Sequence, residues 1–127
     1  QKTDRLLAIL SLQRAEGGME LDEEVSRLLG VDLSDIKAVS SKITIETESG
    51  GSRYPVDMGI DGFLLISTAI LLQVLEIHFS SERKTWARIV RKSRDWIMQV
   101  MQEGSAGIQG RDLMAWAEEF VRNHVRV

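Results

Sequence analysis

The stretch FLLISTAILLQVLEIHF, residues 63–79, decides the fold class. It is the most apolar part of the chain, and Gln73, Glu76 and His78 interrupt its second half. Its 17 residues are at the short limit for a membrane span. A helix that is apolar on nearly all sides is typical of the central core helix of a globular domain. We therefore expect residues 63–79 to form a buried helix at the centre of a bundle.

Helical spacing of apolar residues predicts further helices on both sides of this segment. Before it, one helix is expected from about Thr3 to Ala15, a second from Asp22 to Gly30 and a short third one from Ser34. After it, a helix of about twenty residues begins near Ser80 or Ser81. Its buried stripe is expected to consist of Trp86, Ile89, Val90, Ile97, Val100 and Met101.

Two segments interrupt the helical pattern. Residues 42–58 alternate β-branched and polar side chains around a Ser-Gly-Gly-Ser turn, which is compatible with either a β-hairpin or an irregular loop. Residues 103–110 are rich in glycine and are expected to be a linker before a terminal helix over 111–126. The sequence therefore predicts one all-α domain, a compact bundle of about five to six helices. Its core covers about residues 4–102, with an insertion near 42–58.

Composition excludes several classes of protein. The 127 residues are 43% hydrophobic and 28% charged, which is ordinary for a globular domain, and none is a cysteine. Disulfide scaffolds, thiolate nucleophiles and cysteine-ligated metals are thereby excluded, and a cytoplasmic location is expected. Because the chain begins at Gln1 with no leader after it, we expect a C-terminal fragment of a larger protein.

The sequence offers no recognisable catalytic or ligand-binding motif. His78 and His124 are far apart and neither has a metal-ligand partner at suitable spacing. Gly17-Gly18 and Gly50-Gly51 lack the lysine and hydroxyl of a phosphate-binding loop, and no serine lies in a nucleophile elbow. We expect no enzyme, no cofactor, no metal site and no small-molecule substrate.

Charge is distributed unevenly along the chain. Residues 1–78 carry 7 basic and 13 acidic side chains, net −6, whereas residues 79–127 carry 9 and 6, net +3. Six of the basic residues lie in one predicted helix: Arg83, Lys84, Arg88, Arg91, Lys92 and Arg94. Such a run is compatible with a solvated helix face, a docking site for an acidic protein or a nucleic-acid site. The net charge of −3 and the lack of interleaved aromatic residues disfavour nucleic acid.

The hypothesis for a partner-binding surface names five residues of this helix. Helical spacing of three and four residues places four cations on one face, and Trp96 lies at the edge of the apolar stripe, where it serves either packing or a partner contact. The candidate residues are Lys84, Arg88, Arg91, Lys92 and Trp96.

Several segments resemble a known family. Residues 10–21, LSLQRAEGGMEL, resemble the opening of the C-terminal helical domain of proteins that combine a VIT domain with a von Willebrand factor A domain, as in the vault poly(ADP-ribose) polymerase. Residues 25–30, VSRLLG, and 68–75, TAILLQVL, are similar to the next helices of that domain, and Trp86 and Trp96 fit its paired tryptophans. Met19 stands where the family usually has an aromatic residue.

The resemblance implies a targeting module rather than a catalytic one. In the vault enzyme the corresponding region binds the major vault protein and recruits the enzyme to this ribonucleoprotein particle, while other domains of the parent carry the ADP-ribosyltransferase. The expected partner is therefore the major vault protein, without membrane contact. One alternative is packing against the parent's own VIT and von Willebrand A domains. The other is a nucleic-acid-binding module using the basic helix 83–94.

Overall fold

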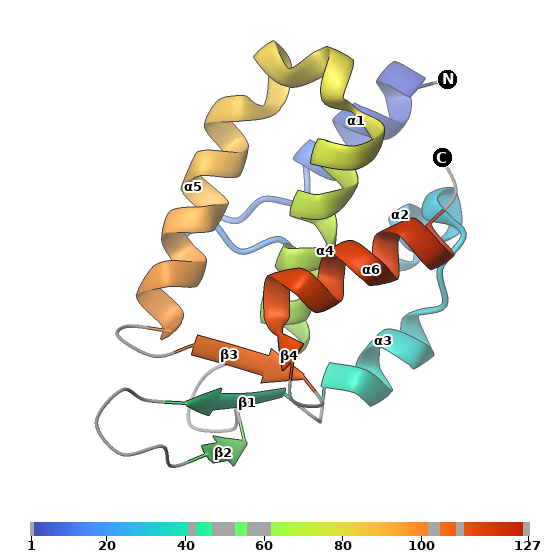
Figure 1. Cartoon of the computed structure of the whole chain (residues 1–127). Helices are drawn as coiled ribbons and strands as arrows, with labels where there is room; N and C mark the ends of the chain where they lie inside the picture. Colours follow the sequence, from blue (N-terminus) through green and yellow to red (C-terminus); the bar gives the residue numbers. More distant parts are fainter. Residues whose placement is uncertain are drawn as a thin grey trace.

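The protein is a helical bundle with a small antiparallel sheet at one end (Figure 1). The computed structural model describes residues 2–40, 43–46, 53–55, 62–101, 105–108 and 111–125. Its α-helices are α1 (Lys2–Leu10), α2 (Glu23–Leu29), α3 (Leu33–Ser40), α4 (Gly62–His78), α5 (Arg83–Met101) and α6 (Leu113–His124), with a 3₁₀ turn at Ser80–Glu82. The strands are β1 (Ile43–Glu46), β2 (Arg53–Pro55), β3 (Ser105–Ile108) and β4 (Arg111–Asp112). The predicted helical bundle is confirmed.

Helix α4 forms the centre of the bundle, as the sequence predicts. Twelve consecutive residues, Leu64 to Leu75, are buried. Helices α3, α5 and α6 pack around it, and α6 crosses its front in Figure 1. Because α4 has neighbours on every side, it needs no polar face, which explains why its sequence is apolar all round.

The sheet joins two segments that are far apart in sequence. Its strand order is β2-β1-β3-β4, and all three pairings are antiparallel. Strands β1 and β2 form a hairpin, one of the two interpretations of residues 42–58. The expectation of a linker over 103–110 is corrected for residues 105–108, which form β3 and pair with β1. Serine, alanine and glycine have low strand propensity. Residues 105–108 therefore form a strand because they pair with β1, and not because their own sequence favours one.

The ends of α2 follow the predicted punctuation, and α6 lies within the predicted range, whereas α1 ends at Leu10 and not near Ala15 as predicted, because residues 11–19 form turns that contact α4 and α5. The Asp22 carboxylate caps α2 by accepting a hydrogen bond from the Val25 amide (2.8 Å), and Gly30 ends that helix with φ of 73°. At the other end of the chain, Asp112 caps α6 through the Met114 and Ala115 amides. These caps pair backbone groups that would otherwise lack partners within the helix.

The turn between α1 and α2 attaches α5 to the rest of the bundle. The Gln13 side-chain amide donates to the Ile89 carbonyl (2.8 Å) and to Ser93 Oγ (2.9 Å), and Ser93 Oγ donates to the Gly17 carbonyl (2.7 Å). Met19 is fully buried beside α4, where the Thr68 hydroxyl accepts its amide hydrogen bond (2.9 Å). The segment of residues 10–21 therefore has a structural role, because its residues form hydrogen bonds to both α5 and α4.

Candidate functional site

Helix α5 has one face in the core and one face exposed. Trp86, Val90 and Ile97 are buried on the first face, and the Trp86 indole donates a hydrogen bond to the Phe79 carbonyl (2.7 Å). Ser93 is also buried on this face, where its hydroxyl takes part in the hydrogen bonds to the α1–α2 turn. The apolar pattern of the sequence does not reveal this serine, because a polar residue interrupts such a pattern.

Three further residues complete the predicted stripe. Ile89 is half-buried, at the edge of the core-facing side. The side chains of Val100 and Met101 lie outside the part of α5 whose burial the structure describes. The predicted stripe is thus confirmed for its buried members from Trp86 to Ile97.

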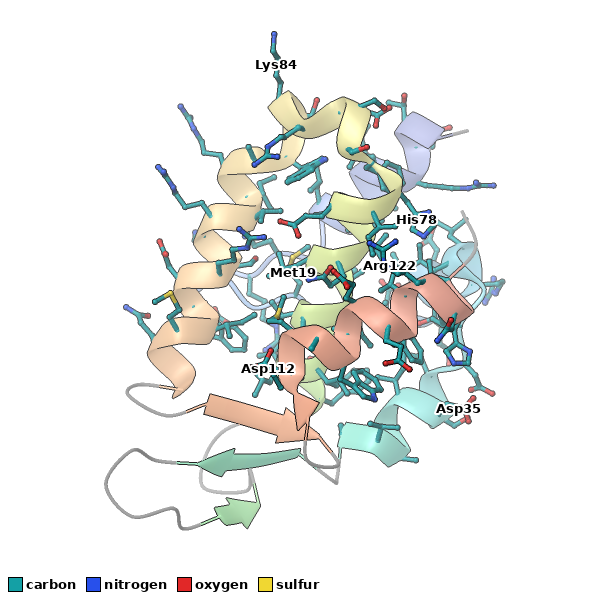
Figure 2. The ribbon with its side chains drawn as sticks, viewed as in Figure 1. Met19, Asp35, His78, Lys84, Asp112 and Arg122 are labelled. Atoms are coloured by element: carbon teal, nitrogen blue, oxygen red, sulfur yellow. The ribbon has the colours of Figure 1, made fainter. Side chains whose placement is uncertain are left out.

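Four cations occupy the opposite face of α5, and we call them the basic face: Lys84, Arg88, Arg91 and Lys92. All four are exposed, and Lys84 points away from the molecule at one end of the helix (Figure 2). Arg88 lies four residues after Lys84, and Arg91 and Lys92 lie three and four residues after Arg88, so the four cations align along one side of the helix, with Asp95 following on the same side. Within the described part of the chain, none of the four takes part in an ion pair.

The other two basic residues of α5 make contacts within the domain. Arg94 forms an ion pair with Glu76 of α4. The Arg83 guanidinium lies 5.8 Å from the centre of the Trp86 ring, within the range of a cation–π contact. A hollow of about 510 Å³ separates α4 from the basic face here, and Glu76, Trp86, Arg88 and Arg91 help to line it. The basic face is therefore continuous with a concave surface.

Trp96 lies at the border of this face rather than within it. Its ring is half-buried and packs against the core. A Cβ atom built on Gly17 would lie only 2.8 Å from Trp96 Cβ, so the α1–α2 turn passes directly over this part of α5. The structure thus brings four of the five candidate residues together on exposed surface and gives the fifth a packing role.

In the ranges that the structure describes, no group of three or more His, Asp or Glu side chains is arranged to hold a metal ion. His78 is half-buried on α4 and His124 is exposed on α6. Asp57 and Asp61, a further acidic pair of the sequence, lie outside the described residues.

Sequence reasoning missed a second concave surface, between α3 and α6. Trp116, Phe120 and His124 follow one another along α6 at intervals of four residues and line it together with Asp32 and Asp35. The sequence signal is the aromatic spacing on α6, which equally fits a core-facing stripe. Trp116 is half-buried and packs against the core.

Comparison with known proteins gives no match: no protein-family model, no curated protein and no solved structure is significantly similar to the chain. In the described part of the chain, no single helix is long and apolar enough to cross a membrane. Among the described helices, the pair Gly62–His78 and Ser80–Gln99 meets that test when taken together, and the two are bent by 91° at their junction.

Proposed function

We propose that this chain is a non-enzymatic protein-interaction domain that docks its parent onto an acidic protein surface through the basic face of α5. The observation that carries the proposal is the alignment of four exposed cations on the helix face opposite the core, without an ion pair among the described residues. The resemblance of residues 10–21, 25–30 and 68–75 to the vault-enzyme domain leads us to propose the major vault protein as partner, in the cytoplasm.

Electrostatics argues for a binding role of this face. Like charges spaced three and four residues apart on a helix repel one another and lower helix stability by a few tenths of a kcal/mol per pair. The basic face holds such spacing at Lys84–Arg88, Arg88–Arg91 and Arg88–Lys92. An acidic partner would remove this repulsion on binding, and the charge complementarity would raise the association rate and fix the orientation.

Packing gives the face a stable geometry. The buried side of α5 is attached through Trp86 to Phe79, the residue just before the 3₁₀ turn, and through Ser93 to the α1–α2 turn. A partner would therefore meet a preformed helical surface, and little backbone ordering would oppose binding. Two of the four residues of this face are arginines. Arginine is enriched at protein interfaces, because its planar guanidinium group can form two parallel hydrogen bonds with one carboxylate.

The first test is co-sedimentation of the purified chain with assembled major vault protein particles. We expect saturable capture that falls by at least about tenfold in Arg88→Glu/Arg91→Glu, since two attractive pairs become repulsive. The matched control is Arg27→Glu/Arg122→Glu, which reverses two exposed arginines on α2 and α6 and leaves the basic face intact. Equal capture of both double variants would overturn the surface assignment.

Two further outcomes separate the alternatives. Exclusion of the wild-type chain from the particles would overturn the vault partner, and binding to the purified VIT and von Willebrand A domains of the parent would then assign a role in intramolecular packing. Binding to single-stranded or duplex nucleic acid that weakens steeply with salt would assign the basic face to the nucleic-acid alternative.

A further inference from the structure

The groove between α3 and α6 combines an apolar floor with an acidic rim. Its volume is about 500 Å³. Val31, Val39, Trp116 and Phe120, all half-buried, form the floor. Among the described residues that line it, no lysine or arginine is present. The groove is thus opposite in charge to the basic face of α5.

Aromatic stacking fixes the floor of this groove. The Trp116 and Phe120 rings stack with centres 5.1 Å apart at 23°, and the His124 ring lies 4.8 Å from that of Phe120. Because these residues are one helical turn apart, α6 holds the rings in one row. The row offers a continuous aromatic strip along the groove.

Three carboxylates form the rim: Asp32, Asp35 and Glu119. They come from two parts of the chain, since Asp32 directly precedes α3, Asp35 lies in its first turn and Glu119 lies on α6. Figure 2 shows Asp35 on the α3 side, below the end of α6. Asp32 accepts hydrogen bonds from the amide (2.9 Å) and the hydroxyl of Ser34, and these bonds lower the pKa of its carboxyl group. All three side chains are exposed at the groove edge.

We propose that this groove binds a basic segment of a partner protein, with an arginine or lysine side chain lying across the floor. The methylene groups of such a side chain pack on apolar surface while the charged end stays at the rim. Arginine fits best, because its planar group pairs with two carboxylates and also stacks on aromatic rings. An acidic segment would meet like charge along this rim and be repelled. This inference is independent of the basic face, which takes a partner of opposite charge.

The three tryptophans of the chain allow a direct test on the whole protein. Trp116 reports on the groove, Trp86 on the hollow beside the basic face and Trp96 on the packing under the α1–α2 turn. We would titrate the ¹⁵N-labelled chain with acetyl-Gly-Arg-Gly-Arg-Gly-amide to millimolar concentration and follow the indole N–H resonances, assigned through Trp116→Phe. We expect a saturable shift at Trp116, little change at Trp86 and Trp96, and no shift with the citrulline analogue, which is neutral but similar in shape.

Variants of neighbouring carboxylates refine the test. Glu119→Gln and Asp35→Asn should each raise Kd about two- to fivefold, the range expected for one exposed ion pair. The matched control is Glu118→Gln, the adjacent carboxylate on α6, which pairs with Arg122 and does not line the groove. Its Kd should equal that of the wild type.

The proposal would be overturned by an unmoved Trp116 resonance at millimolar peptide, by an equal response to the citrulline peptide, or by equal effects of the Glu118 and Glu119 variants. Self-association of the free chain that Glu119→Gln abolishes would also overturn it, because the groove would then belong to a second copy of the domain.

Discussion

Helices α4 and α5 follow one another in sequence and have similar lengths, 17 and 19 residues, yet they bury different fractions of their surfaces. α4 has a buried stretch of twelve residues, with packing partners all round. α5 buries one stripe and leaves four cations on its other face exposed. The difference indicates a division of roles, in which α4 contributes buried apolar residues that stabilise the fold and α5 contributes exposed charged surface. Substitutions in the two helices should separate these roles.

The largest expected effect is in α4. Leu71 is fully buried, and Leu71→Ala should lower the free energy of unfolding by about 2–5 kcal/mol through lost burial and the cavity left behind. The control is Met98→Ala in α5, where the side chain is 65% exposed and the change should stay within about 0.5 kcal/mol. Chemical denaturation monitored by circular dichroism measures both. Similar losses in the two variants would contradict the division of roles.

Next in size is the contact between the α1–α2 turn and α5. Gly17 has φ of 116°, and a Cβ atom there would lie 2.8 Å from both the Lys92 carbonyl oxygen and Trp96 Cβ. Gly17→Ala should therefore destabilise the fold by about 1–3 kcal/mol. The alanine would be held at an unfavourable positive φ, and a shift that relieved this strain would not also remove the clash of its Cβ with the α5 backbone. Gly18→Ala is the matched control, because its Cβ would meet only the Leu64 side chain, at 3.1 Å. A larger loss in Gly18→Ala by thermal denaturation would contradict this ranking.

The hydrogen bonds of Ser93 come third. Ser93→Ala should cost about 1–2 kcal/mol, because the Gly17 carbonyl loses its donor and the Gln13 amide loses an acceptor. A double-mutant cycle with Gln13→Ala should give a coupling energy of at least about 0.5 kcal/mol, as expected for residues in direct contact. Additive losses in denaturant unfolding would show that the two side chains act independently of each other.

Sequence reasoning succeeded where the pattern was local. The central helix is expected over residues 63–79 and is observed at Gly62–His78, because an all-apolar run requires burial whatever its neighbours are. The spacing of Lys84, Arg88, Arg91 and Lys92 by itself places them on one face of a helix, and they lie together on the exposed face of α5. In both cases one helix contains all the information that the prediction needs.

The features that sequence reasoning missed depend on residues far apart in the chain. Residues 105–108 form a strand only because β1, about sixty residues earlier, offers an edge to pair with. The α3–α6 groove brings Asp32 and Asp35 to Trp116 and Phe120, and no local pattern connects those segments. The burial of Ser93 was missed for the same reason. Its hydroxyl can be buried because it forms a hydrogen bond with the distant α1–α2 turn.

The smallest expected change in stability is also the one that tests the role of α5 most directly. Arg88→Glu replaces repulsion with attraction towards Lys84, Arg91 and Lys92, so it should raise the free energy of unfolding by about 0.2–1 kcal/mol at low salt. The gain should disappear at high salt, because these exposed charges are screened. Denaturant unfolding at two salt concentrations measures it, with Arg88→Gln separating loss of repulsion from new attraction. If Arg88→Glu is more stable but binds its partner less well, the basic face serves binding at the expense of stability. If Arg88→Glu is instead less stable than the wild type, Arg88 contributes to the stability of the fold.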